Sequence, residues 1–206
     1  MSAPFQLFGG HPVLDLVNTL DNRFVGTGCV ELLPSYTDVL RFARQSQILS
    51  SQQVARLEHR ARGSAASRVL HSVHELREAL GMLFYASSAK SDLNPEALKL
   101  IERHVIDANA QRELVAGPAS RRTNPVGASW SWSSRQNRLE LPLWILSKSA
   151  EALLTSEDFA HVHACQRDAC RWLFLDSSKN HSRRWCDMKV CGNRAKAQRF
   201  HAKHGR

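Results

Sequence analysis

The amino-acid sequence predicts a mainly α-helical fold, in which a multihelical N-terminal domain with a few short β-strands precedes a small C-terminal module of β-hairpin and helix. Three observations predict it. Apolar residues recur at helical spacing through most of the first 157 residues. They make up 43% of the 206 residues, which is enough for a substantial core. Four of the five cysteines fall within residues 165–191, a stretch too short for an apolar core of its own.

Three helical patterns open the chain. The stretch HPVLDLVNTL (residues 11–20) repeats apolar side chains at helical spacing. SYTDVLRFARQSQIL (35–49) follows, with Ser35 or Thr37 as its expected N-cap. SSQQVARLEHRAR (50–62) also begins with serines, which favour helix starts because their hydroxyls accept hydrogen bonds from free backbone N–H groups.

Three more helices are expected further along the chain. The longest should cover Ser67 to Ala89, and NPEALKLIERHVIDAN (94–109) starts with an asparagine cap and a proline at the first helical position. Gly-Pro and Asn-Pro pairs interrupt residues 111–141, where ASWSWSS (128–134) alternates as a strand does. PLWILSKSAEALL (142–154) returns to helical spacing.

We place the domain boundary near residue 157, which gives domains of residues 1–157 and 158–206. The charge is uneven between them. Residues 158–206 hold 11 Lys/Arg against 4 Asp/Glu, a surplus of +7, whereas residues 1–157 hold 17 against 15. A local basic surplus is typical of proteins that bind a polyanion, most often nucleic acid. The alternative is a basic tail that only keeps the protein soluble.

The cysteines of the C-terminal module, Cys165, Cys170, Cys186 and Cys191, form the pattern C-x4-C-x15-C-x4-C. Two short-spaced pairs predict one structural Zn²⁺ bound by four thiolates, which would staple the module. Residues five apart in a regular helix point about 140° from each other, so each pair must leave regular helix. We expect Cys186 in a turn and Cys191 at the start of the terminal helix. Disulfides, buried thiols, a redox pair and an iron–sulfur cluster stay open as alternatives.

The segment between the two cysteine pairs is expected to be a hairpin. RWLFLD (171–176) has the pattern of a strand, SSKNHSR (177–183) that of a turn, and RWC (184–186) is expected to begin the return strand.

Sequence patterns also limit the class of protein. No apolar run reaches the length of a transmembrane helix, and the N-terminus lacks a secretory pattern. We therefore expect a cytoplasmic, nucleoid-associated protein whose thiols stay reduced. The sequence contains no nucleophile elbow, phosphate-binding loop, dinucleotide fingerprint or zinc-protease motif. We expect a protein that is not an enzyme.

Basic side chains around the cysteines are assigned two roles. Zn²⁺ with four thiolates carries a net negative charge, which Arg171 and Arg194 are expected to offset. Arg194 and several other basic residues are also predicted to contact nucleic acid, with double-stranded DNA favoured and RNA as the alternative. The predicted nucleic-acid-binding residues are Arg183, Arg184, Arg194, Lys196, Arg199, Lys203 and Arg206, of which Lys196, Arg199, Lys203 and Arg206 form one stripe of the terminal helix.

The C-terminal motif resembles a known family. CRWLFLDSSKNHSRRWCDMKVCGNRAKAQRF (170–200) is similar to the CGNR zinc fingers, named for the tetrapeptide that begins at Cys191. LDLVNTLDNR (14–23), ELLPSYTDVLRFARQSQIL (31–49) and LPLWILSKSAEALLTSEDF (141–159) resemble the ABATE domain that precedes such fingers. The resemblance implies a bacterial zinc protein of the stress-related transcription regulator class, with the four cysteines as ligands.

The stretch NTLDNR (18–23) suggests a possible ligand pocket, in which Asn18 and Arg23 would bind a small anionic effector. The favoured interpretation of Arg23 is an internal salt bridge with Asp15 or Asp21. For the whole chain we favour a DNA-binding regulator with a helical sensor domain. An RNA-binding or ribosome-associated module and a thiol redox sensor are the alternatives, and a homodimer stays open.

Overall fold

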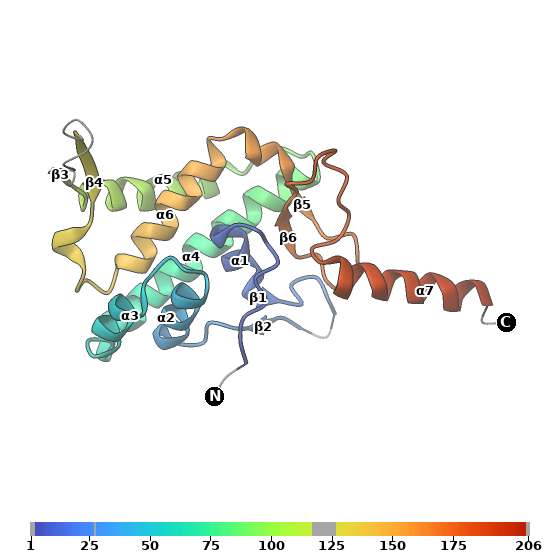
Figure 1. Ribbon diagram of the computed structural model, residues 1–206, viewed down its shortest axis with the longest axis horizontal. Helices are drawn as coiled ribbons and strands as arrows, with labels where there is room; N and C mark the ends of the chain where they lie inside the picture. Colours follow the sequence, from blue (N-terminus) through green and yellow to red (C-terminus); the bar gives the residue numbers. More distant parts are fainter. Residues whose placement is uncertain (1–2, 27, 117–126, 205–206) are drawn as a thin grey trace, which may run out of the picture.

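One long helix, α4 (Gly63–Ser88), runs through the middle of the protein, and the other helices of the body pack around it (Figure 1). The computed structural model describes residues 3–26, 28–116 and 127–204. The body contains α1 (Pro12–Asn18), β1 (Leu20–Asp21), β2 (Val30–Glu31), α2 (Tyr36–Gln45), α3 (Ser51–Glu58), α4, α5 (Pro95–Ala110), β3 (Glu113–Ala116), β4 (Ala128–Ser131), the 3₁₀ turn η1 (Ser133–Arg135) and α6 (Leu141–Leu154). The mainly α-helical fold is confirmed.

The C-terminal part begins with a second 3₁₀ turn and ends in a helix that extends away from the body (Figure 1). Its elements are η2 (Glu157–His161), β5 (Val162–Ala164), β6 (Leu173–Leu175), the short π-helix η3 (Met188–Gly192) and α7 (Asn193–His204). Within the described ranges the strands form three antiparallel pairs: β1 with β2, β3 with β4, and β5 with β6. No helix of the described ranges is both long and apolar enough to cross a membrane.

Several helices begin where a side chain can satisfy the free backbone N–H groups. Ser35 caps α2, Asn94 caps α5 by accepting hydrogen bonds from two backbone N–H groups, and Ser50 forms a reciprocal capping box with Gln53 at α3. α4 begins at Gly63, four residues before the predicted start at Ser67. Its first turn is held by packing, because Ala66 is buried in the core.

Helix α1 lies at the centre of the core rather than on its surface. It packs against α4, α6 and β6, and its apolar side chains, Val13, Leu14, Leu16 and Val17, are completely buried. A helix that is apolar on nearly all sides must be enclosed by other elements. This position brings the end of α1 against the C-terminal part of the chain.

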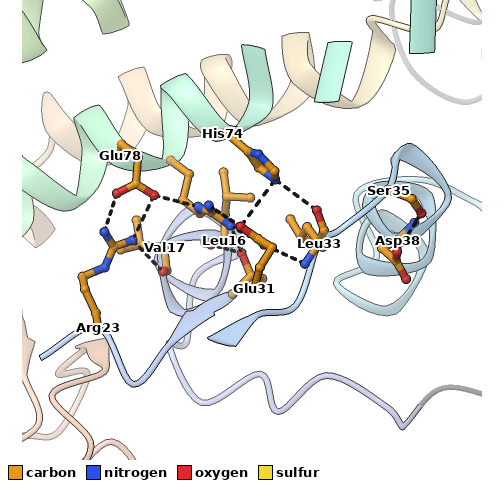
Figure 2. A network of polar contacts seen from close by, with 11 residues as sticks. Leu16, Val17, Arg23, Glu31, Leu33, Ser35, Asp38, His74 and Glu78 are labelled. Atoms are coloured by element: carbon orange, nitrogen blue, oxygen red, sulfur yellow. Dashed lines mark hydrogen bonds and ion pairs between the residues drawn. The ribbon is translucent and has the colours of Figure 1, made fainter. Parts of the chain in front are cut away.

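A partly buried ion network ties the β1–β2 pair to α4, as Figure 2 shows. The guanidinium of Arg77, which is 3% exposed, donates two hydrogen bonds of 2.7 Å to the Glu31 carboxylate and one of 3.0 Å to Glu78. Glu78 also pairs with Arg23, and His74 lies 3.0 Å from the backbone oxygen of Leu33. A bidentate arginine–carboxylate pair combines charge with fixed geometry, so it determines how the strand pair lies on the helix.

A buried carboxyl group holds the N-terminal segment against α1. The backbone N–H of Gly9 donates a 2.7 Å hydrogen bond to Asp15, and a side chain at Gly9 would collide with the same carboxylate. Burial raises the pKa of Asp15 to about 6, and this hydrogen bond offsets part of that effect.

The pH dependence of stability should reveal Asp15. Because the folded-state pKa lies above the unfolded value of 3.8, the protonated carboxyl favours the folded state, and this contribution is lost as pH rises to about 6 and beyond. We expect the free energy of unfolding of wild type, relative to Asp15→Asn, to fall by about 1.5 kcal/mol between about pH 5 and 8. The measurement is urea unfolding of both proteins at several pH values. A pH-independent difference would contradict the assignment.

Candidate metal centre

The first cysteine pair is placed by the β5–β6 hairpin. The hairpin packs on α4 and α1, and the backbone hydrogen bond from Cys165 to Trp172, 2.8 Å, extends the ladder by one step. Between these residues the chain makes a tight turn, closed by a 2.8 Å hydrogen bond from the Cys170 N–H to the Arg167 carbonyl. Arg171 leaves the turn with φ of 59°, in the left-handed region. The turn points both thiols to one side.

The second pair is placed by the start of α7. Cys186 lies in a bend, as predicted, and Cys191 lies in η3, which continues directly into α7. Asp187 forms the cap: its side chain accepts a 2.6 Å hydrogen bond from Val190, and its carbonyl accepts one from Cys191. The x4 spacing would point the two cysteines apart in a regular α-helix. The wide turn of the π-helix η3 removes this conflict.

The predicted return strand at residues 184–186 is wrong. β6 pairs with β5, which precedes the first cysteine, and residues 184–186 lie in no strand. The reason is the buried carboxylate of Asp176, which accepts backbone hydrogen bonds from Ser178, 2.9 Å, and Arg183, 2.7 Å. These bonds close residues 176–183 as a loop and leave Arg184 with one backbone bond, from Gln166.

The four sulfur atoms lie close enough to share one metal ion. All four Sγ atoms are within 4.8 Å of one another, and the Cys170–Cys186 and Cys186–Cys191 distances are both 3.6 Å. A tetrahedral zinc site with Zn–S bonds of about 2.3 Å requires sulfur atoms about 3.8 Å apart. Cys165, Cys186 and Cys191 are buried and Cys170 is half-buried. The donor set and its geometry fit Zn²⁺.

Without a metal, the thiols would share protons. Hydrogen bonds from the Cys170 and Cys186 thiols lower the pKa of Cys165 to about 2. The same contact with Cys165 raises the pKa of Cys170 to about 12, and it also raises the pKa of Cys186. A metal bound by four thiolates must displace these protons, so its uptake releases protons and depends on pH.

The arginines near the sulfur atoms have different environments. Arg183 is committed internally: it donates a 2.8 Å hydrogen bond to the Trp185 carbonyl, contacts the Cys186 carbonyl and lies over the Phe174 ring. Arg194 lines a cavity of about 140 Å³ beside Cys170, consistent with its expected role in offsetting the thiolate charge. Arg171, which was expected to share that role, has its guanidinium 6.0 Å from the Phe24 ring centroid.

A second concavity lies between the first cysteine turn and α7. It has a volume of about 580 Å³, and three arginines from separate parts of the chain line it. Arg167 comes from the turn, Arg184 from the loop before Cys186, and Arg199 from α7. Trp185 and Gln198 also line it, and the Arg184 guanidinium lies 5.4 Å from the Trp185 ring centroid. We call this concavity the basic groove.

The predicted nucleic-acid residues therefore have different environments. Arg184 and Arg199 line the basic groove, and Lys196 is exposed on α7 beside it. The side chain of Lys203 and the whole of Arg206 lie outside the described residues. The sequence did not single out Arg167, and the only signal for it was its position inside the first cysteine pair.

The two residues of the predicted ligand pocket are both engaged within the chain. Asn18 is buried; its amide donates to the Leu173 carbonyl, 2.9 Å, and accepts from the Leu173 N–H, 2.8 Å. Arg23 forms the expected internal salt bridge, but its predicted partner was wrong. It pairs with Glu78, whereas Asp15 accepts from Gly9 and Asp21 accepts from Trp172, because the β1–β2 pair directs Arg23 toward α4.

Contacts between the body and the cysteine module continue beyond Asn18. The indole N–H of Trp172 donates a 2.8 Å hydrogen bond to Asp21, and the Tyr85 hydroxyl donates to the Arg171 carbonyl, 3.1 Å. Leu173 itself belongs to the main core. These contacts cross the boundary drawn near residue 157, which stays a prediction.

Fold and site together define the class: a helical domain followed by a zinc-finger module with four cysteines. Residues 10–157 match the ABATE family, described as "Putative stress-induced transcription regulator", and residues 161–204 match the CGNR zinc finger. The chain belongs to the ABATE family and carries a CGNR zinc-finger module, as the sequence motifs indicated. No curated protein matches the chain.

Removing the Asn18 amide should weaken the attachment of the module. In Asn18→Ala, the buried N–H and C=O of Leu173 lose their partners, which we expect to cost on the order of 3 kcal/mol of the free energy of unfolding. Chemical denaturation provides the measurement. The exposed Asn137→Ala serves as the control and should change stability by less than about 0.5 kcal/mol. Equal stability of the two variants would mean that the module and the body are energetically independent.

Proposed function

We propose that this protein is a DNA-binding transcription regulator of the bacterial nucleoid, in which one structural Zn²⁺ builds the module that contacts DNA. The observation that carries the proposal is the basic groove, where Arg167, Arg184 and Arg199 converge beside Trp185. The helical body would serve as the sensor domain. The family description supports a role in transcription.

The metal would be held by Cys165, Cys170, Cys186 and Cys191, and it would supply folding free energy rather than catalysis. The module has only a small apolar cluster of its own, around Trp172 and Phe174. Because the first pair lies on the hairpin and the second lies at the start of α7, joining the four sulfurs fixes the direction of α7. The basic groove is formed only when both pairs are joined.

The chemistry of the groove suits a nucleic-acid backbone with adjacent bases. Three guanidinium groups can donate paired hydrogen bonds to phosphate oxygens, and Asp168 is the acidic residue among those that line the groove. Gln198 and the exposed Lys196 extend the polar surface along α7, which stands away from the body in Figure 1. A protruding basic helix can reach into a DNA groove without a collision between the body and the duplex.

Metal content tests the first part of the proposal. Reduced wild-type protein should contain one zinc per chain, and Cys186→Ser should lose most of it, because three thiolates no longer close the tetrahedron. Cys29→Ser is the matched control, since Cys29 is exposed and lies outside the cluster, and it should keep its zinc. Elemental analysis of the purified proteins measures this. Equal zinc in the two variants would refute the four-thiolate site.

Salt dependence tests the second part. If Arg184 and Arg199 contact phosphates, replacing both with alanine should flatten the slope of log K against log[salt] by about 2, because each phosphate contact contributes about 0.9. Binding to all duplex sequences should weaken alike, since phosphate contacts carry no sequence information. Fluorescence anisotropy titrations at several salt concentrations give the slopes.

The control removes the same charge elsewhere. Arg68→Ala with Arg103→Ala lowers the net charge equally, but these exposed side chains lie on α4 and α5, outside the module. Its slope should match that of wild type. If both double variants change the slope equally, the groove is not the binding surface. Competition with a structured RNA separates the RNA alternative, which predicts that RNA displaces the duplex.

A further inference from the structure

A groove on the helical body lies next to the ion network, because Glu78 and His74 line it. It lies between α4 and the N-terminal half of α5 and has a volume of about 490 Å³, which is within the range of small-molecule sites. Its inner surface includes Ala79 and Ala97, which are almost completely buried. Met82, 55% exposed, and the half-buried Leu100 add apolar side chains. We call it the α4–α5 groove.

The acidic groups of this groove are three carboxylates, although the chain has a net charge of +9, and its other polar side chains are His71, His74 and Asn94. Glu75, Glu78 and Glu96 all line it, with side-chain exposures of 41%, 38% and 78%. Glu75 has an imidazole as its ion-pair partner, His71 at 3.7 Å, rather than an ammonium or guanidinium group. An apolar groove with carboxylates at its border is complementary to a molecule that has an apolar part and a positive charge.

One of these carboxylates also belongs to the ion network in Figure 2. Glu78 accepts hydrogen bonds from Arg23 and from Arg77. Burial alone would raise the pKa of Glu78, but the hydrogen bonds and charges of the two guanidinium groups hold it below its ordinary value. The same Glu78 carboxylate therefore lines the groove and takes part in the ion network. A cation in the groove would compete with Arg23 for it.

The residues on both sides of Arg23 in the chain contact groups at or near the zinc finger. The next residue, Phe24, packs edge-on against Tyr85 with ring centroids 4.8 Å apart, and the Arg171 guanidinium lies over the same ring. Arg171 follows Cys170 in the chain, and its carbonyl accepts the Tyr85 hydroxyl hydrogen bond. Two residues before Arg23, Asp21 accepts the Trp172 indole N–H. A shift of the Arg23 turn would therefore act on Arg171 and Trp172, the two residues that follow the first cysteine turn.

We propose that the α4–α5 groove binds a small amphipathic organic cation, an apolar amine or quaternary ammonium compound, and that binding is coupled to the zinc finger through Glu78 and Arg23. As a means of regulation this rests on the proposed DNA-binding function, whereas the binding itself does not. The apolar part of the ligand would lie against Ala79, Met82 and Ala97. Its charge would lie between Glu75 and Glu78.

Calorimetry with a matched pair of probes tests the binding without DNA. Phenylbutyltrimethylammonium carries the expected charge, and phenylpentanoate has a similar apolar part with the opposite charge. We expect the cation to bind at least about tenfold more tightly than the anion, a difference of about 1.4 kcal/mol or more. No heat from the cation at millimolar concentration, or equal binding of the two probes, would overturn the proposal.

Two pairs of variants locate the site. Met82→Lys places a positive charge in the groove and should abolish binding of the cation, whereas Leu98→Lys changes a comparably exposed residue of α5 that does not line the groove and should have no effect. Glu75→Gln should weaken binding about tenfold, and the exposed Glu102→Gln should leave it unchanged. These side chains are partly or fully exposed, so the variants should fold. Wild-type affinity in Met82→Lys would overturn the site.

The coupling has its own readout. The indole N–H resonance of Trp172, assigned with Trp172→Phe, should shift when the groove is saturated with the cation, because its acceptor Asp21 lies next to the Arg23 turn. A resonance that stays unchanged at saturation would overturn the coupling and leave the binding site intact. Neither measurement involves DNA, so a failure of the DNA-binding proposal would be seen separately, in the anisotropy titrations.

Discussion

The side-chain amide of Asn18 connects the helical body to the cysteine module. It forms with Leu173 of β6 the two hydrogen bonds that a neighbouring strand would otherwise form. β6 pairs with β5 on one side only, and the N–H and C=O of Leu173 face the body. Asn18 satisfies both, and the Gly9 carbonyl accepts from Leu175 two residues further along the same edge. An uncovered strand edge would present free backbone groups, so these contacts both close the edge and set the register of the hairpin.

The position of the metal site follows from this attachment. Because α1 is buried in the core, Asn18 has a fixed place, and the hairpin that carries the first cysteine pair is fixed with it. The second pair has fewer contacts with the body and is held by the sulfur cluster and by the loop around Asp176. Zinc would therefore join the first cysteine pair, which the body orients, to the second cysteine pair, which the body does not orient. The direction of α7 depends on both.

Sequence patterns predicted the features that depend on local spacing. The helices follow from apolar periodicity and from caps such as Ser35 and Asn94, and the cysteine spacing indicated both the metal and the break in the helix before Cys191. The contacts of individual arginine side chains could not be predicted from the sequence. Arg183 and Arg184 are adjacent and identical in type, yet the first is committed internally and the second lines the basic groove. The loop closed by Asp176 makes the difference.

Long-range ion pairs escaped prediction for a related reason. Arg23 pairs with Glu78, 55 residues away, and this partner became available only because the β1–β2 pair lies across α4. One signal was present in the sequence: Arg77 follows Val73 by four residues and precedes Leu80 by three, so a charged residue stands on the apolar face of the helix. A charge in that position requires a buried partner.

The same network gives the body a means to act on the finger. Between the α4–α5 groove and Cys170 there are few steps: Glu78 to Arg23, Phe24 to Tyr85, and Tyr85 to the carbonyl of Arg171. Each step is a direct contact, and each partner also has contacts within its own element. Energetic coupling requires an element with two arrangements, and the turn at residues 21–24 meets this condition best, because its outer part is exposed while both of its anchors, Asp21 and Arg23, bind groups on other elements. A cation that draws Glu78 from Arg23 would release one anchor and leave the other attached to the finger.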